Sequence, residues 1–352
     1  MHRVLSRLEE EIARGGGWIS FARYMEIVLH APGAGYYAGA APKFGPQGDF
    51  VTAPELGTLF GRTLARQIAD LGVHEVLELG AGSGALADTL LTKLGCPYSI
   101  LETSGNLRAR QQARLGERVS WLERLPERID GVVLANEVVD ALPVHAVAWR
   151  PEGVVERGVS LIGGRLAWSE RPATGELLAV ASALPVQAPY ESEIALVARA
   201  WMRELALRLE RGVILVIDYG FPRREYYHPQ RSMGTLMCHH RHRAHGDPFA
   251  HPGDEDVTAH VDFTALAEAA VDAGLEVLGY ATQAHFLVNC GITDVLAEAN
   301  IDNALHYAPL AAEAQKLLSP SEMGELFKVL AVGRGVARPL LGFAHGDRAA
   351  TL

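Results

Sequence analysis

The sequence predicts an α/β fold of the Rossmann-like type, a doubly wound parallel sheet preceded by a helical segment and interrupted by two insertions. Three observations support this prediction. From residue 74 onward, short apolar strands alternate with helical patterns. The first of these strands runs into a glycine-rich loop that opens a helix. The segment 213–217 is apolar at every position, which indicates a central strand covered on both faces.

Two helices, a long loop and a third helix are expected before this core. Residues 1–14 carry apolar side chains on one helical face, and Ser20 is a good N-cap for a second helix that ends near residue 30. Residues 31–54 are rich in glycine, proline and aromatic side chains, and structured loops of this kind are often functional. Residues 55–71 then show the spacing of a helix with one buried face.

The strands of the core are recognised as short apolar runs bounded by turn residues. They are expected at 75–79, 98–102, 119–122, 131–135, 213–217, 276–280 and 327–332. Helices at 85–93 and 107–115 separate the first three strands, as the alternation requires.

Two stretches, 144–190 and 221–261, break the alternation. Each begins after the carboxyl end of a core strand, at the edge where open α/β sheets bind ligands. We predict that both are cap or substrate-recognition insertions; insertion without a role is the alternative, and for 144–190 it is nearly as strong. The chain then divides into an N-terminal segment packing on the core (1–73), the first part of the core (74–143), an insertion of strands and a helix (144–211), the second part of the core with its inserted loop (212–335), and a tail (336–352).

The composition of the chain indicates which kinds of molecule it can bind. The 352 residues include 49% hydrophobic and 21% charged residues, a globular mixture, and the formal net charge is −10. An acidic chain repels phosphate backbones, so we expect no nucleic acid and weakly favour a basic peptide or protein. The three cysteines form no C-x-x-C pair, no apolar run has the length of a membrane span, and the N-terminus lacks a signal-peptide pattern. We therefore expect a cytoplasmic protein without membrane insertion, and the oligomeric state stays open.

The glycine-rich loop at 78–85 predicts a nucleotide-type ligand. Gly80, Gly82 and Gly84 permit a tight turn and let the backbone approach a ligand closely. The same spacing suits a dinucleotide-binding oxidoreductase, so NAD is an alternative. Glu78 favours S-adenosylmethionine, because that ligand has no pyrophosphate and its methionine end carries an ammonium beside a sulfonium.

An acid at the end of the second strand fits the same ligand class. Glu102 follows the loop by about twenty residues, where a carboxylate can accept hydrogen bonds from both ribose hydroxyls. NAD sites use the same device, so Glu102 does not discriminate between the two ligands. Its other interpretation is a solvated carboxylate at a strand end.

A polar run follows the fourth strand at the same edge of the sheet. Asn136 and Glu137 are candidates for contacting the cofactor or the methyl acceptor, whereas Asp140 can instead cap the local turn. Asp218 closes the fifth strand in the same way and is expected to face the same pocket.

With these residues described, the chain resembles the MidA-like methyltransferases, which are bacterial and mitochondrial relatives of the assembly-factor methyltransferase of respiratory complex I. The resemblance extends over nearly the whole chain and rests on several motifs in a fixed order. These are Ile19–Met25, Pro32–Tyr37, Gly48–Glu55, the glycine loop, Asn136–Pro143, Asp218–Gly220, Gly234–Leu236 and Asp256–Phe263. The resemblance implies a seven-stranded core, S-adenosylmethionine as cofactor and methylation of an arginine guanidinium in a protein. In mitochondrial members the product is symmetric dimethylarginine on a complex I subunit, and for this chain that target is an expectation.

An arginine acceptor requires carboxylates. The guanidinium has a pKa above about 12 and is a poor nucleophile while its charge is delocalised. Carboxylates that form paired hydrogen bonds orient one nitrogen and accept the proton lost on methylation. The candidates are Asp49, Glu55 and Glu137, with Asp218 in reserve. Asp49 can instead be a turn residue, and Glu55 can stabilise a helix N-terminus.

Histidines give two further hypotheses. His260, near the carboxylates Asp256 and Asp262, is a candidate base or substrate contact, although a structural role is the more common one for a lone histidine. The histidines within 239–251 match no zinc spacing and are interleaved with arginines, so no metal is expected.

Two other functions stay open at this point. An NAD-dependent oxidoreductase would account for the glycine loop and Glu102, but it leaves 48–55 and 136–143 unexplained. A non-enzymatic S-adenosylmethionine-binding chaperone for an assembling respiratory subunit would use the two insertions as its docking surface.

Overall fold

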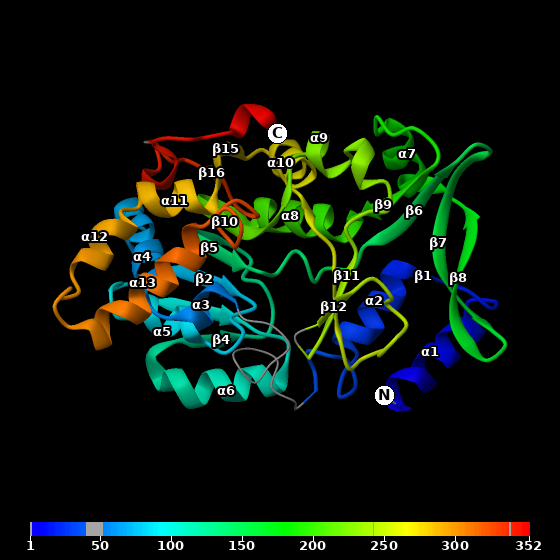
Figure 1. The fold of residues 1–352 in the computed structure, drawn as a ribbon, viewed down its shortest axis with the longest axis horizontal. Coiled ribbons are helices and arrows are strands. Elements are labelled where there is room, and N and C mark those ends of the chain that lie inside the picture. Colours follow the sequence, from blue (N-terminus) through cyan, green and yellow to red (C-terminus); the bar gives the residue numbers. More distant parts are fainter. Residues whose placement is uncertain (1, 40–51, 242, 338) are drawn as a thin grey trace.

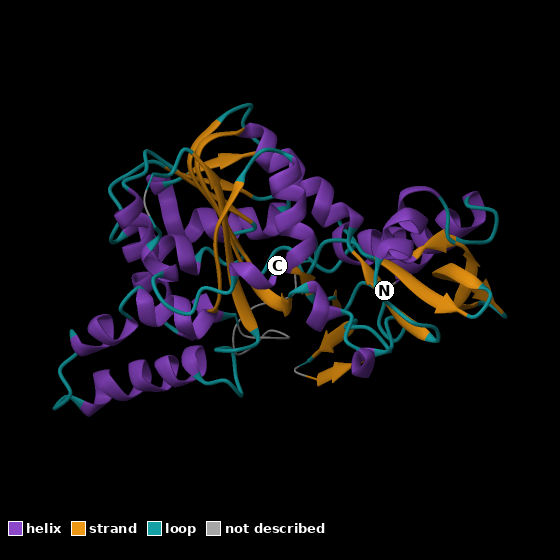
Figure 2. Cartoon of the chain, turned by 90° about the horizontal axis from the view of Figure 1, so that it is seen from above, coloured by secondary structure: helices purple, strands orange, loops and turns teal. Residues whose placement is uncertain are grey.

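The computed structural model describes all residues except 1, 40–51, 242 and 338. Figure 2 shows a large part, in which helices flank both faces of a central sheet, and a smaller part built from further sheets and helices. We call the first the core and the second the cap module. No described helix is long and apolar enough to cross a membrane.

The core sheet has the strand order β15-β16-β10-β5-β2-β3-β4, and the short strand β14 (Val261–Asp262) adds to β10 at its end. The seven main strands are β2 (Val76–Leu79), β3 (Tyr98–Leu101), β4 (Ser120–Leu122), β5 (Ile129–Asn136), β10 (Leu209–Phe221), β15 (Glu276–Thr282) and β16 (Phe327–Arg334). The expectation of an all-parallel sheet is wrong for β16, which runs antiparallel to both β10 and β15. Because β15 reaches β16 through consecutive helices and β16 then inserts between two strands, local sequence patterns could not reveal its direction.

Helices bury both faces of this sheet, which explains the uninterrupted apolar run in β10. Val213, Leu215 and Ile217 point to one apolar cluster, whereas Ile214 and Val216 point to another, and all five are fully buried. The first face is covered by α4 (Leu59–Leu71), α5 (Ala85–Leu91), α11 (Gln283–Asn289), α12 (Ile292–Ala297) and α13 (Ala304–Leu318). The second face is covered by α8 (Leu196–Arg208) and α10 (Phe263–Asp272), while α6 (Gly105–Leu115) lies beyond the glycine loop. The helix α8 therefore belongs to the core and not to the insertion 144–211.

The cap module combines the N-terminus with both insertions (Figure 1). Strand β1 (Ile19–Ser20) pairs with β7, so that Ile19 lies opposite Val159. The remaining strands of that sheet are β6 (His145–Arg150), β7 (Gly153–Ile162), β8 (Arg165–Pro172) and β9 (Tyr190–Ile194), and its helices are α1 (His2–Arg14), α2 (Phe21–His30) and α7 (Gly175–Ala183). The second insertion contributes α9 (Arg223–Tyr226) and a small sheet of β11 (Met237–His240), β12 (Arg243–His245) and β13 (Asp256–Thr258). Short 3₁₀ turns lie at η1 (Gly116–Arg118), η2 (Pro229–Arg231), η3 (Leu341–Phe343) and η4 (Ala349–Thr351).

The proposed segment 1–73 is therefore divided between the two parts. Helices α1 and α2 pack with β7 and β13 in one apolar cluster of the cap module, whereas Ala53, Leu56 and α4 pack on the core. The predicted N-cap is confirmed, because the Ser20 hydroxyl accepts a hydrogen bond from the Arg23 amide at 3.1 Å.

The predicted helix 55–71 is wrong at its start, where the structure has a short helix α3 (Ala53–Leu56), a break, and then α4. The cause is a carboxylate distant in the sequence. Glu313 of α13 accepts hydrogen bonds from the amides of Leu59 at 2.8 Å and Phe60 at 3.1 Å, which caps α4 at its N-terminus. A side chain at Gly57 would lie 2.1 Å from a Glu313 oxygen. The break leaves Glu55 on its own turn, facing the candidate site.

Candidate active site

A cavity of about 360 Å³ opens where β2, β3 and β5 end at their carboxyl edge, beside the cap module. The loop after β2, the ends of β3 and β5, the short helix α3 and the end of α2 all contribute to its wall. Of the residues predicted from the sequence, the following line it: Glu55, Glu78, Gly80, Gly82, Glu102, Asn136 and Glu137. Gly84, Asp218 and His260 lie outside its wall, and Asp49 lies outside the described residues.

The glycine loop has the backbone conformation that its sequence predicts. Gly80, Gly82 and Gly84 have φ values of 64°, 54° and 81°, in the left-handed region that favours glycine. A Cβ atom at Gly80 would lie 3.2 Å from Val138 Cγ2. Gly84 acts differently, because it is the N-cap of α5 and a Cβ atom there would meet Leu115 at 3.3 Å. The first two glycines thus form part of the cavity wall. The third lets the start of α5 lie close to Leu115 of α6.

Two buried carboxyl groups stand on either side of this loop. Glu78 accepts a hydrogen bond from the Tyr98 hydroxyl at 2.8 Å, and burial raises its pKa to about 7. Glu102 accepts hydrogen bonds from the Ser104 amide at 2.8 Å and from Gln111 Nε2 at 3.0 Å, and burial raises its pKa also. A cationic or donor-rich ligand would offset the cost of ionising such groups.

Gln111 is a site residue that sequence reasoning missed. Its Nε2 donates both to Glu102 and to the Gly82 carbonyl oxygen, each at 3.0 Å, so it fixes the carboxylate relative to the loop. The Trp121 indole in turn donates to Gln111 Oε1 at 3.1 Å, which fixes the amide orientation. No motif marks a glutamine in the middle of a helix, and only its position facing the loop could have indicated the role.

Apolar side chains cover another part of the wall. They are Leu101, Leu107, Leu125, Leu142 and Trp201. A flat aromatic ring fits between such groups, with polar atoms held at the rim by Glu102 and Ser104. The cavity therefore suits a nucleoside whose base is buried and whose ribose meets a carboxylate.

The polar run after β5 forms the acidic end of the cavity. Glu137 has a φ of 53°, a strained value for a residue with a side chain, and its amide donates to the Ile217 carbonyl oxygen at 2.9 Å. Its carboxyl group accepts hydrogen bonds from Asn136 Nδ2 at 3.1 Å and from the Ala53 amide. Burial, together with the nearby charge of Asp140, raises the pKa of Glu137 to about 8.

Acceptor oxygens of Asn136 and Asp140 also lie at this end of the cavity. Asp140 Oδ2 accepts from the Tyr219 hydroxyl at 2.5 Å, and burial raises the pKa of Asp140 to about 6. The Asp140 carboxyl also accepts hydrogen bonds from the backbone amides of Ala141 and Asp140, and Asn136 Oδ1 is buried without a donor among the residues that the structure describes. Buried polar atoms are normally satisfied, so unpaired acceptors on a cavity wall indicate a ligand rich in donors. Asp140, expected to be a turn cap, therefore lies in the wall of the site itself.

Asp218 does not face the cavity, contrary to expectation. Its carboxylate accepts hydrogen bonds from three backbone amides, those of Val139 at 2.9 Å, Asp140 at 3.2 Å and Tyr219 at 2.9 Å. These bonds hold the turn that carries Glu137 and Asp140. Asp218 is thus a positioning residue, and its side chain points into the turn because the amides there need an acceptor.

We expect Asp218→Ala to destabilise the protein by about 2 kcal/mol or more, because the substitution leaves buried amides without an acceptor. Asp130→Ala, which removes an exposed carboxylate from the neighbouring strand β5, serves as the control and should change the stability little. Urea denaturation measures both. Equal stability of the two variants would refute the positioning role.

His260 is also excluded from the cavity. Its ring stacks on Phe221 at 5.3 Å between centroids and meets the edge of Tyr219 at 5.1 Å. Burial lowers its pKa to about 4, so the ring is neutral and a weak base at physiological pH. Its contacts agree with the structural role and give no path to the acceptor.

Glu55 contacts the glycine loop. It accepts a hydrogen bond from the Ser83 hydroxyl, and Arg114 donates to that same hydroxyl at 2.9 Å. Its carboxylate thus lies over the loop, whereas Glu137 and Asp140 lie at the acidic end.

Among the described histidines, His240 stacks on His251 at 4.3 Å and His245 lies 3.0 Å from a Glu255 oxygen. No three side chains of the described residues form a metal-binding group.

The chain is similar in sequence to known proteins. Residues 59–281 match a family model described as "Putative S-adenosyl-L-methionine-dependent methyltransferase". The Drosophila melanogaster protein arginine methyltransferase NDUFAF7 homolog is 29% identical, over 93% of this chain and 86% of its own length. The human protein arginine methyltransferase NDUFAF7 is also 29% identical, over 90% of this chain and 80% of its own length.

Two solved structures from Burkholderia thailandensis are more similar. The first, a "likely methyl transferase" bound to S-adenosyl-homocysteine, is 51% identical, covers 100% of this chain and 97% of its own, and has a TM-score of 0.96. The second, the native structure of an uncharacterized protein, is 50% identical with a TM-score of 0.93, over 100% of this chain and 96% of its own. The ligand of the first structure is the demethylated form of S-adenosylmethionine.

Proposed function

The chain belongs to the family of S-adenosyl-L-methionine-dependent methyltransferases, and on this basis we propose that it methylates an arginine guanidinium of a protein. The cofactor is S-adenosylmethionine, which decides between the two nucleotide ligands that the glycine loop allowed. The names of the mitochondrial relatives motivate the arginine acceptor, and the acidic end of the cavity supports it. We further propose that the enzyme acts in the cytoplasm, from its cysteine usage.

The observation that carries the proposal is the set of acceptor oxygens at the acidic end. A guanidinium presents five N–H donors in one plane and no acceptor. The side-chain oxygens of Asn136, Glu137 and Asp140 place several acceptors together at this end of the cavity. Such oxygens bind a guanidinium through charge-assisted hydrogen bonds and orient one nitrogen. An anionic acceptor would be repelled by the same carboxylates.

Each part of the wall then has a task. Glu78, Gly80, Gly82 and Glu102 would hold the cofactor, with the apolar wall around its base, and Gln111 would hold Glu102 in place. When bound, S-adenosylmethionine supplies a methyl group on a positively charged sulfur. Glu137 and Asp140 would hold the guanidinium in line with that methyl group, and such positioning lowers a barrier by about 7–11 kcal/mol in favourable cases.

The proton balance assigns Glu137 a second task. The attacking nitrogen loses one proton as its bond to the methyl carbon forms, and a nearby carboxylate accepts it. A pKa of about 8 is close to the pH of the cell, so Glu137 can both receive this proton and release it.

The rate of methyl transfer is expected to rise with pH between about 6 and 8 and then to level off. Burial raises the pKa values of Asp140 to about 6 and of Glu137 to about 8, so both are protonated in acid and neither can bind the guanidinium as an anion. The pH profile of kcat/KM for the acceptor measures this. A profile flat over that range would contradict the assignment of these carboxyls.

The direct test uses methyl-labelled S-adenosylmethionine and an acceptor pool of proteins from cells in which the gene is deleted. After reaction with the purified enzyme, the labelled proteins are hydrolysed to amino acids. Label in methylated arginine supports the proposal. Label confined to another amino acid or to small molecules refutes the arginine acceptor and leaves the methyltransferase class intact.

A further inference from the structure

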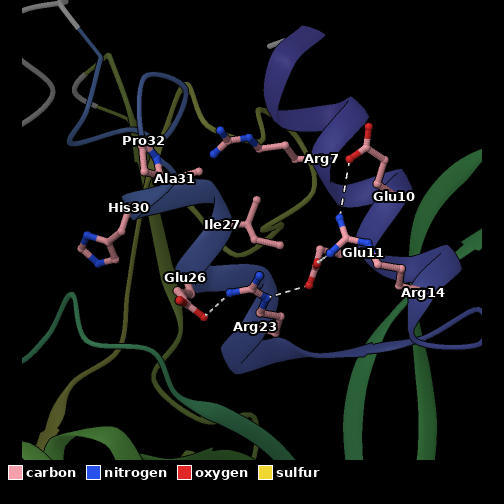
Figure 3. Close-up of a pocket in the computed structure, with 10 residues that line it drawn as sticks. All are labelled: Arg7, Glu10, Glu11, Arg14, Arg23, Glu26, Ile27, His30, Ala31 and Pro32. Carbon is pink, nitrogen blue, oxygen red and sulfur yellow. Dashed lines mark hydrogen bonds and ion pairs between the residues drawn. The ribbon is translucent and has the colours of Figure 1, made fainter.

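A second cavity of about 290 Å³ lies between α1 and α2, outside the site described above. Ile27, Ala31 and Pro32 give it an apolar floor, and charged side chains of both helices form its sides (Figure 3). The charged residues are Arg7, Glu10, Glu11, Arg14, Arg23 and Glu26. We call this cavity the α1–α2 groove.

The α1–α2 groove adjoins the active cavity, because His30 lines both. Its Nε2 lies 3.2 Å from the Ala141 carbonyl oxygen, and its ring stacks on Tyr37 at 5.6 Å between centroids. Both Ala141 and Tyr37 line the active cavity. The imidazole therefore lies between the groove and the methyl-transfer site, and desolvation lowers its pKa.

Most charges of the groove are already paired within it. Arg23 binds Glu11 at 2.9 Å and Glu26 at 2.7 Å, and Arg14 binds Glu11 at 2.6 Å. Arg7 is different, because it has no ion-pair or hydrogen-bond partner in the described part of the chain. Its guanidinium extends from α1 across the groove towards Ala31 and Pro32, at the end of α2 nearest to His30 (Figure 3).

We propose that the α1–α2 groove binds the segment of the acceptor protein next to the methylated arginine, and that Arg7 pairs with a carboxylate of that segment. This inference rests on the proposed function, since it assumes a protein acceptor. The guanidinium enters the acidic end of the active cavity, and the flanking chain lies on the apolar floor of the groove. The carboxylates of the active cavity bind the target arginine, and Arg7 in the groove binds a carboxylate next to it in the acceptor. Because these two charges are opposite, they fix the direction of the bound segment.

The test compares Arg7→Glu with Arg3→Glu, which changes an exposed arginine one turn earlier on α1 that does not line the groove. Methyl transfer to the acceptor pool from deletion cells is measured at increasing pool concentration, together with calorimetric binding of S-adenosylmethionine. We expect Arg7→Glu to raise the apparent KM for the pool roughly threefold to tenfold, with kcat and cofactor affinity unchanged. Arg3→Glu and the conservative Arg7→Lys should keep the parent KM.

An unchanged KM in Arg7→Glu would overturn the inference, as would a loss of cofactor affinity or thermal stability in that variant, which would indicate a structural role. If the parent enzyme places no methyl group on arginine, the proposed function fails first and the inference fails with it. Arginine methylation by the parent enzyme therefore distinguishes a failure of the proposed function from a failure of this inference alone.

Discussion

Replacing Gly82 by valine is expected to abolish the binding of S-adenosylmethionine. Gly82 has a φ of 54°, a region that β-branched residues almost never occupy, and it lines the cavity. A valine there must distort the loop. The Gly82 carbonyl oxygen also accepts the hydrogen bond from Gln111 Nε2 at 3.0 Å that joins Gln111 to the loop. Affinity measured by calorimetry should fall about 100-fold or more.

Gly95→Val is the matched control. Gly95 lies in an exposed turn, and a Cβ atom there would meet no atom within 4 Å. The same substitution should therefore leave cofactor affinity at the parent value. If Gly82→Val bound the cofactor as tightly as Gly95→Val, the glycine loop would not be the binding element.

Replacing Glu137 by glutamine is expected to slow methyl transfer roughly 100-fold or more while cofactor affinity is kept. Glutamine has the same shape and can keep the contacts with Asn136 and the Ala53 amide, but it carries no charge and accepts no proton. The measurement is kcat with labelled cofactor, beside calorimetric titration. Glu176→Gln, which changes an exposed carboxylate on α7, should leave the rate unchanged.

The same variant separates an enzyme from a chaperone. A non-enzymatic assembly chaperone would keep its cellular function in Glu137→Gln, since the cap module is intact and the cofactor still binds. An enzyme would lose that function along with catalysis. Full function of Glu137→Gln in cells would therefore contradict the catalytic proposal.

The core was predictable because its strands are short apolar runs and their ends carry the functional groups. Gly80, Gly82, Asn136 and Glu137 lie at strand ends or directly after them, and all of them line the cavity. The cap module was not predictable, because its assembly depends on contacts such as Ile19 with Val159, which no local pattern encodes. The break before α4 likewise depends on Glu313, more than two hundred residues away.

Side-chain direction explains the errors within the site. Asp218 and His260 stand in polar motifs near the sheet edge, yet one turns to satisfy backbone amides and the other is enclosed by Phe221 and Tyr219. Conversely, Gln111 reaches the site from the middle of a helix. A sequence gives the order of such residues along the chain but not the rotamer that packing selects.

Methylation of a protein arginine bound at the acidic end of the cavity is the function that we propose. Its most direct test is mass spectrometry of proteins from deletion cells that carry either the parent gene or the Glu137→Gln variant. We expect a methylarginine that is absent in deletion cells, restored by the parent gene and not restored by the variant. Methylarginine unaffected by the deletion, or restored equally by Glu137→Gln, would contradict it.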